Sequence, residues 1–169
     1  MNLPKRKPNR LNNYNYNTNG CYFVTLCTQN RKRLFEIENV GNNLRVVSQL
    51  QNQIIHKWVK ETENKYGNVK FDKYVILPDH LHFIINFSEQ HAGCSLPNVM
   101  RFFKTMTTNE YIRCVKSNNL VPFDKKLWQK SYYDHIIRNQ NDYNEVWQYI
   151  DNNPTNWVLK NQSPQNTKI

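Results

Sequence analysis

The sequence predicts a single α+β domain. We expect a ferredoxin-like split βαβ sandwich, in which an antiparallel sheet carries helices on one face, followed by an extra C-terminal helix. Strand-like and helical segments follow one another in the order strand, helix, strand, strand, helix, strand, helix. No internal repeat or long interior linker divides the 169 residues, a length that suffices for one hydrophobic core. Because this fold hosts many activities, function has to be argued from a site.

The strands are predicted from runs of β-branched and aromatic residues. Such runs cover residues 21–28, 71–77 and 81–87, and a further strand is expected within 128–138. The Pro78-Asp79 pair between the second and third runs is the signal of a tight turn.

Two helices are predicted from apolar residues at helical spacing. The first covers about 43–66 and is closed by Gly67. The second covers about 95–116, with Ser95 as its N-cap and Ile112 on its buried side.

A last helix is expected to be capped by Asn141 or Asp142 and to extend through Asn153, with Pro154 near its end. The polar and basic residues 1–19 should form an arm, residues 20–160 the folded domain and residues 161–169 a frayed tail.

The positive charge favours a polyanionic partner. The net charge is +10 and the pI is about 9.5, and each neutralised phosphate would release counterions. A solvated basic surface that only keeps the protein soluble is the alternative. No apolar run is long enough to span a membrane, no amphipathic anchor accompanies the charge, and no secretory signal is expected. The four cysteines lack a C-x-x-C pair, which favours buried free thiols in a reducing cytoplasm over a zinc site.

The stretch that carries chemistry contains His80 and His82. Side chains alternate across a strand, so both imidazoles share one face, whereas Leu81 and Phe83 point into the core. Two imidazoles placed in this way can bind one divalent ion. The alternative is a pair of polar residues on a solvated strand face.

Other two-histidine motifs do not fit. A histidine-triad hydrolase needs a third histidine where Ile84 stands, and a two-histidine phosphodiesterase needs Ser or Thr where His82 stands. The H-E-x-x-H motif of zincins is absent. The pattern that remains is histidine, hydrophobic residue, histidine.

The last helix could complete the site. Tyr149 and Asn153 are four residues apart and share one helix face. If that face lies over the strand with His80 and His82, Asn153 could supply an oxygen ligand and Tyr149 a hydroxyl. Capping of the helix end by Asn153 and core packing of Tyr149 are the structural alternatives.

These residues make the chain resemble the REP-associated tyrosine transposases, a branch of the single-tyrosine HUH transposases. The resemblance extends from about residue 20 to 157, in the family's order. The segments that carry it are YFVTLCTQNR (22–31), VILPDHLH (75–82), WQKSYYDHIIR (128–138) and YIDNNP (149–154).

The resemblance implies a ferredoxin-like fold and nicking and rejoining of DNA with Mg²⁺ or Mn²⁺ as cofactor. It implies His80 and His82 as metal ligands, Asn153 as the third ligand and Tyr149 as the nucleophile of a 5′-phosphotyrosine intermediate. The implied partner is single-stranded or hairpin DNA with REP-like palindromes, handled by a monomer or homodimer. The residues expected to contact DNA are Arg6, Lys7, Arg10, Arg31, Arg33, Arg101, Lys104, Lys130, Tyr132 and Arg138.

Exposed rings of Trp128, Tyr132 or Tyr133 are expected to stack on bases. Three other readings remain open. A non-catalytic nucleic-acid-binding module could use the same fold, charge and aromatics. A replication initiator or relaxase shares the chemistry but usually carries further domains. A nuclease that uses water in place of tyrosine would form no covalent adduct.

Overall fold

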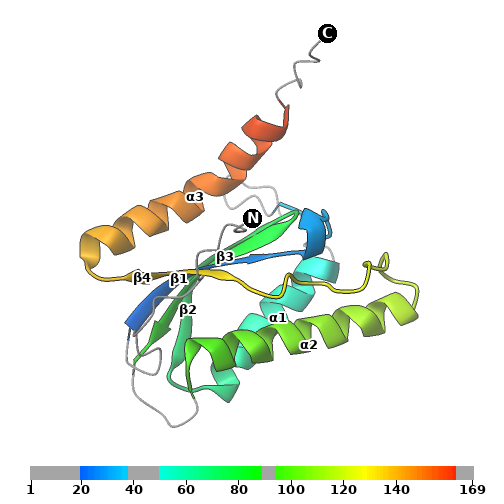
Figure 1. The fold of residues 1–169 in the computed structure, drawn as a ribbon, viewed down its shortest axis with the longest axis horizontal. Coiled ribbons are helices and arrows are strands. Elements are labelled where there is room, and N and C mark those ends of the chain that lie inside the picture. The colour runs from blue at the N-terminus through cyan, green and yellow to red at the C-terminus, as the bar shows by residue number, and fades with distance from the viewer. Residues whose placement is uncertain (1–19, 38–49, 89–93, 163–169) are drawn as a thin grey trace, which may run out of the picture.

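The computed structural model describes residues 20–37, 50–88 and 94–162 (Figure 1). The predicted arm, the first residues of the first predicted helix and most of the predicted tail lie outside these ranges. The elements, in chain order, are β1 (Gly20–Cys27), a 3₁₀ turn η1 (Gln29–Arg31), α1 (Leu50–Lys65), β2 (Val69–Leu77), β3 (His80–Phe87), α2 (Leu96–Lys116), β4 (Tyr133–Ile137) and α3 (Gln140–Gln162).

The four strands form one antiparallel sheet in the order β2-β3-β1-β4. Pro78 and Asp79 form the tight turn that joins β2 to β3, as predicted. On β1, Tyr22, Val24 and Leu26 are fully buried, whereas the residues between them are half-buried. The alternation sends one set of side chains into the core and the other to the opposite face.

Helices cover both faces of the sheet (Figure 1). Helices α1 and α2 pack against each other and against the face that carries Tyr22, Leu81 and Phe83, and together they enclose the main core. Helix α3 crosses the other face, where its Ile150 joins a smaller apolar cluster. The element order and layers confirm the predicted split βαβ sandwich with an added C-terminal helix.

Helix α3 differs from the prediction at both ends. The side chain of Asn139, not Asn141 or Asp142, caps its start, because Asn139 Oδ1 accepts a hydrogen bond of 2.9 Å from the backbone N–H of Asp142. The helix also continues through Pro154 to Gln162.

Contacts with the loop after β1 explain why α3 can pass the proline. The guanidinium of Arg33 lies 4.8 Å from the centre of the Trp157 ring and donates a hydrogen bond of 2.6 Å to Asn161 Oδ1. These contacts hold the two helical turns after Pro154 in place. Pro154 itself is buried, and the contacts offset the hydrogen bond that a proline removes from a helix.

Two features of α2 also differ. Ser95 stands at the N-cap position but makes no capping hydrogen bond through its side chain, and Ile112 is exposed, not buried. All four cysteines are free thiols, of which Cys94 is buried. None of the helices in the described ranges is long and apolar enough to cross a membrane.

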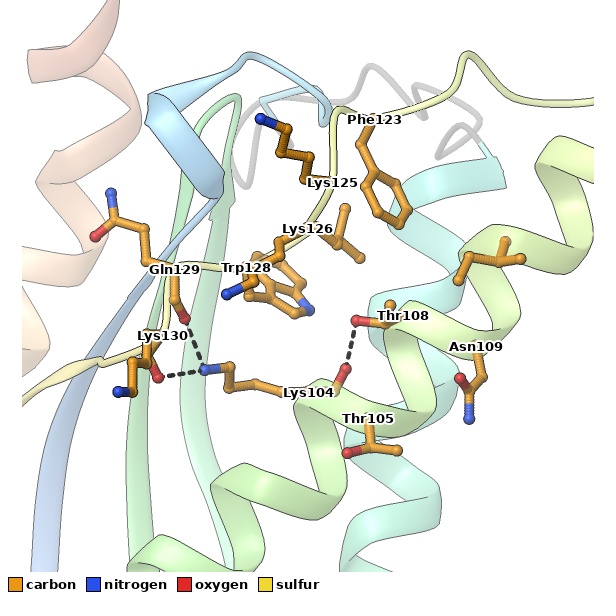
Figure 2. A pocket seen from close by; sticks show the side chains of 12 residues that line it. Lys104, Thr105, Thr108, Asn109, Phe123, Lys125, Lys126, Trp128, Gln129 and Lys130 are labelled. Atoms are coloured by element: carbon orange, nitrogen blue, oxygen red, sulfur yellow. Dashed lines mark hydrogen bonds between the residues drawn. The ribbon is translucent and has the colours of Figure 1, made fainter.

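The segment between α2 and β4 is tied to the core by Trp128 and Lys104. Trp128 is buried, stacks on Phe35 at 5.4 Å and donates a hydrogen bond of 2.9 Å to Thr107 Oγ1. The Lys104 ammonium donates to the backbone oxygens of Gln129 and Lys130 at 2.7 and 2.9 Å (Figure 2). Lys104 therefore fixes the backbone of this segment, and burial lowers the pKa of its ammonium.

We expect Lys104→Met to lower the free energy of unfolding by about 1–2 kcal/mol, because two hydrogen bonds from a charged donor are lost while most of the stem remains. Urea denaturation followed by circular dichroism measures this. Lys116→Met, at the exposed end of the same helix, is the control and should change stability by much less. Equal losses in the two variants would contradict the role of Lys104.

Candidate active site

The centre of the site is the histidine pair at the start of β3. His80 and His82 lie on the face covered by α3, are 8% and 3% exposed, and have ring centres 4.7 Å apart with planes at 86°. Leu81 and Phe83 point to the other face and are fully buried in the main core. The predicted separation of the two sets is confirmed.

One nitrogen of each ring is held by a neighbouring side chain. His80 Nδ1 donates a hydrogen bond of 2.6 Å to Asp79 Oδ1, and His82 Nδ1 shares a hydrogen bond of 2.9 Å with Thr25 Oγ1. The Nε2 atom of each ring is then left to bind a ligand. His82 Nε2 is buried and has no hydrogen-bond partner among the described residues.

Both histidines are kept in the neutral form that binds metals. Burial, together with the neighbouring His80 and Arg31, lowers the pKa of His82 to about 3. Burial also lowers the pKa of His80, although the Asp79 carboxylate opposes this shift.

Helix α3 places Tyr149 next to the pair. The Tyr149 ring stands edge-on to His82 at 5.3 Å and to Phe23 at 5.7 Å, and the residue is 50% exposed. One ring therefore contacts both the histidine site and solvent. Core packing alone does not describe such a tyrosine.

Asn153 lies one turn beyond Tyr149 on the same helix face and is buried, at 8% exposed. The Tyr149 ring contacts His82, and Trp157, one turn beyond Asn153, contacts Arg33 in the segment after β1. Asn153 lies between these two anchors. Because α3 continues past it, Asn153 does not cap a helix end.

The first half of α3 is fixed to the sheet by apolar and ionic contacts. Lys73 on β2 forms an ion pair of 2.5 Å with Asp151 and lies 3.9 Å from the centre of the Trp147 ring. Ile150 is buried in the smaller apolar cluster between these residues and the sheet. The residues before and after Tyr149 in this turn, Trp147, Ile150 and Asp151, are thus all held against the sheet.

The residues present fit a divalent metal ion. Two neutral imidazoles and the amide oxygen of Asn153 can supply nitrogen and oxygen ligands. His82 Nε2, which is buried and lacks a hydrogen-bond partner among the described residues, has the environment expected of a metal ligand whose ion is absent. In the described part of the chain, no three His, Cys, Asp or Glu side chains come together as a metal cluster. Among the described residues, a third protein ligand would therefore come from another residue type, such as Asn153.

Arg31 places a positive charge beside the histidines. Its Nε lies 3.6 Å from Asp79 Oδ2, its Nη1 donates to Cys27 Sγ at 3.2 Å, and its side chain is 51% exposed. Arg31 and Asn30 both adopt positive φ, 54° and 55°, a conformation that is unfavourable for side chains with a Cβ. Such strain is found preferentially at functional sites.

The other residues predicted to contact DNA fall into separate groups. Lys130 is exposed near the end of β1, whereas the polar groups of Lys104 and Arg33 are engaged within the protein. Arg101 lies near the start of α2, which covers the face of the sheet opposite the histidines, and Arg138 lies at the opposite end of β4 from the histidines. Arg6, Lys7 and Arg10 lie outside the described residues.

The prediction that Trp128 and Tyr132 offer exposed rings is wrong. They are 4% and 9% exposed and belong to the main core, because the segment before β4 packs under α2. Tyr133 is the exposed ring, at 57%. It pairs with Thr25 across β1 and β4, so it faces the same side of the sheet as His82.

Thr25, Phe23 and Asp79 are site residues that the motifs did not single out. The alternation along 21–27 already places Phe23 and Thr25 on one face, and Asp79 directly precedes His80. Only the register of β1 against β3 shows that Thr25 stands opposite His82. That register is set by long-range pairing and cannot be read from either strand alone.

Comparisons with known proteins bear on the fold and on the family of this chain. An uncharacterized protein of Haemophilus influenzae is 34% identical over 166 residues, which cover 90% of this chain and 89% of that protein. The solved structure of a REP-associated tyrosine transposase bound to a REP hairpin shares the fold, with a TM-score of 0.58 and 20% identity over 88% of this chain and 74% of that one. A candidate transposase of Deinococcus radiodurans matches with a TM-score of 0.52 and 15% identity over 85% and 95%.

The family model described as "Transposase IS200 like" matches residues 17–153, which include β1, the histidine pair and the turn of α3 that bears Tyr149. The chain belongs to the IS200-like transposase family.

Proposed function

We propose that this transposase nicks and rejoins single-stranded DNA at hairpins through a 5′-phosphotyrosine formed on Tyr149. The observation that supports this most is the Tyr149 ring at 5.3 Å from His82, whose Nε2 is buried without a hydrogen-bond partner among the described residues. A tyrosine beside a pair of imidazoles that could bind a metal ion is the arrangement that nucleophilic phosphoryl transfer needs.

The reaction is a transesterification. The Tyr149 oxygen forms a bond to the scissile phosphorus while the bond from phosphorus to the 3′ oxygen breaks. The phenol proton is released to water, and the 3′ oxygen takes up a proton to become a free hydroxyl. Attack by another 3′-OH reverses these steps and rejoins the DNA, so no external energy source is required.

His80, His82 and Asn153 would hold the metal, each imidazole through Nε2. A bound divalent ion supplies positive charge that stabilises the phosphate in the transition state. Imidazole suits Mn²⁺ better than Mg²⁺, which prefers oxygen ligands, so Mn²⁺ is the better probe of this site. Arg31, half-exposed beside His80, is placed to bind the same phosphate.

The substrate is proposed from charge and from a fold neighbour. The net charge of +10 favours a polyanion, and the REP-associated transposase with the same fold was solved bound to a REP hairpin. We extend hairpin DNA to this chain as its substrate class. The competing function, a module that only binds DNA, would not explain why His82 Nε2 is buried without a hydrogen-bond partner among the described residues.

Tyr149→Phe should abolish the covalent protein–DNA adduct. The change removes one oxygen and keeps the ring contacts with His82 and Phe23, so folding and DNA binding should persist. Labelled hairpin DNA is incubated with protein and Mn²⁺, and the adduct is detected on a denaturing gel. Tyr143→Phe, on the same helix, is the matched control and should still form it.

Two outcomes would count against Tyr149. An adduct that persists in Tyr149→Phe but disappears in Tyr132→Phe or Tyr133→Phe would move the nucleophile to another residue. Metal-dependent cleavage by the unmodified chain without any adduct would indicate a water-dependent nuclease.

His82→Ala should remove Mn²⁺ binding and reduce cleavage to background. Hairpin affinity should stay within about twofold, because phosphate contacts to basic residues dominate it. Calorimetry with Mn²⁺ and a gel-based cleavage assay measure the two effects, with circular dichroism as the control for folding. The same results are expected for His80→Ala, and cleavage by the double variant would refute the metal site.

Thr25→Val should weaken Mn²⁺ binding by about tenfold, since a partner that orients a ligating histidine typically contributes that much. The valine keeps the shape of the side chain but leaves His82 Nδ1 without its hydrogen bond. Calorimetric titration with Mn²⁺ measures the effect. Thr108→Val, which removes a hydroxyl bonded within α2, is the control, and an equal loss there would contradict the positioning role.

A further inference from the structure

A cavity lies beside the histidine site, toward strand β4. Its volume is about 400 Å³, and it is lined by Thr25 and Cys27 at the end of β1, by Gln29 and Lys126, and by residues 129–133. Thr25 forms part of its wall and also shares a hydrogen bond with His82. The cavity is therefore separated from the candidate metal site by one side chain.

The lining is basic and carries one exposed aromatic ring. Lys126 and Lys130 are exposed, Ser131 adds a hydroxyl, and no acidic side chain is among the residues that line the cavity. Tyr133 is 57% exposed. Proteins bind single-stranded DNA with ammonium groups beside an exposed aromatic ring, because the ring stacks on a base and the cations contact the phosphate backbone.

The strand register places Tyr133 near the histidine pair but not in contact with it. Thr25 on β1 pairs with His82 on one side and with Tyr133 on the other, so all three side chains lie in one row on the same face. The row spans two strand spacings, roughly 10 Å. A base stacked on Tyr133 would thus belong to a nucleotide close to the phosphate that Tyr149 attacks.

The wall formed by residues 126–130 is fixed in advance. Lys104 donates to the backbone oxygens of Gln129 and Lys130 from the far side, as Figure 2 shows, and Gln129 N–H donates to Cys27 O at 2.9 Å. A cavity whose wall is already ordered loses little conformational freedom when a ligand binds. This favours a binding site over an incidental surface hollow.

We propose that this cavity binds an unpaired nucleotide of the substrate strand next to the scissile phosphate. The base stacks on Tyr133, and the backbone phosphate lies at Lys126 and Lys130. This assignment rests on the proposed function for its substrate class, single-stranded DNA, and gives Tyr133 a binding role distinct from that of the nucleophile.

Equilibrium binding tests the proposal in the Tyr149→Phe background, where cleavage does not interfere. The probes are a labelled blunt hairpin and the same hairpin with an oligothymidine flank, followed by fluorescence anisotropy. Tyr133→Ala should weaken binding of the flanked hairpin by about tenfold and leave the blunt hairpin within twofold. Tyr133→Phe keeps the stacking face and should restore flank binding.

The lysines are tested through salt dependence. Lys126→Gln or Lys130→Gln should reduce the slope of log K against log[salt] for the flanked probe by about 0.7, the value for one lost contact to a single strand. Lys125→Gln is the matched control and should leave the slope unchanged. Lys125 does not line this cavity but a different one, which lies between α2 and the segment 123–130 (Figure 2).

Two results would overturn the nucleotide site: equal affinity of Tyr133→Ala and its parent for the flanked hairpin, or an equal loss for both probes. Its failure differs from failure of the proposed function. Absence of an adduct in the chain with Tyr149 intact overturns the catalytic proposal, whereas the contrast between flanked and blunt hairpins is measured without cleavage and decides the nucleotide site alone.

Discussion

The pairing of β1 with β3 is the constraint on which the rest of the structure depends. Leu26 faces Leu81 in the core, and the next positions on either side place Thr25 against His82 and Cys27 against His80 on the opposite face. A slip of one residue would turn the histidines into the apolar core and Leu81 out of it. Burial of Leu81 and Phe83 therefore holds the histidines in place, so core stability and site geometry depend on the same register.

The two faces of the sheet are covered in different ways. Under α1 and α2 the side chains form one continuous core in which Phe83 contacts Phe71 and Phe103. Under α3 the apolar cluster around Ile150 is small and gives way to the polar histidine end. The dense face supplies rigidity, and the sparse face leaves Tyr149 half-exposed, as the proposed reaction with a phosphodiester requires.

Local sequence patterns predicted the strands, the histidine face and the turn with Tyr149, because these depend on residue periodicity and one turn dipeptide. They did not predict the passage of α3 through Pro154, since the compensating contacts come from Arg33, far away in sequence. The burial of Trp128 and Tyr132 was missed for a similar reason. An aromatic residue in a basic segment gives no local sign of whether a helix covers it, and the covering helix α2 is separated in the chain.

Pro154 follows Asn153 directly and has a consequence for the helix that carries both site residues. A proline has no N–H to donate, so the Ile150 carbonyl lacks its usual partner one turn later, and the ring crowds that carbonyl. The turn from Tyr149 to Asn153 is thus the place where α3 is weakest in its own hydrogen bonding. Its shape is imposed by the sheet beneath it, through Ile150 and the Lys73–Asp151 ion pair. Tyr149, the proposed nucleophile, would therefore become misplaced before the domain unfolded. Local order in this turn is then a more sensitive measure of the proposed activity than global stability.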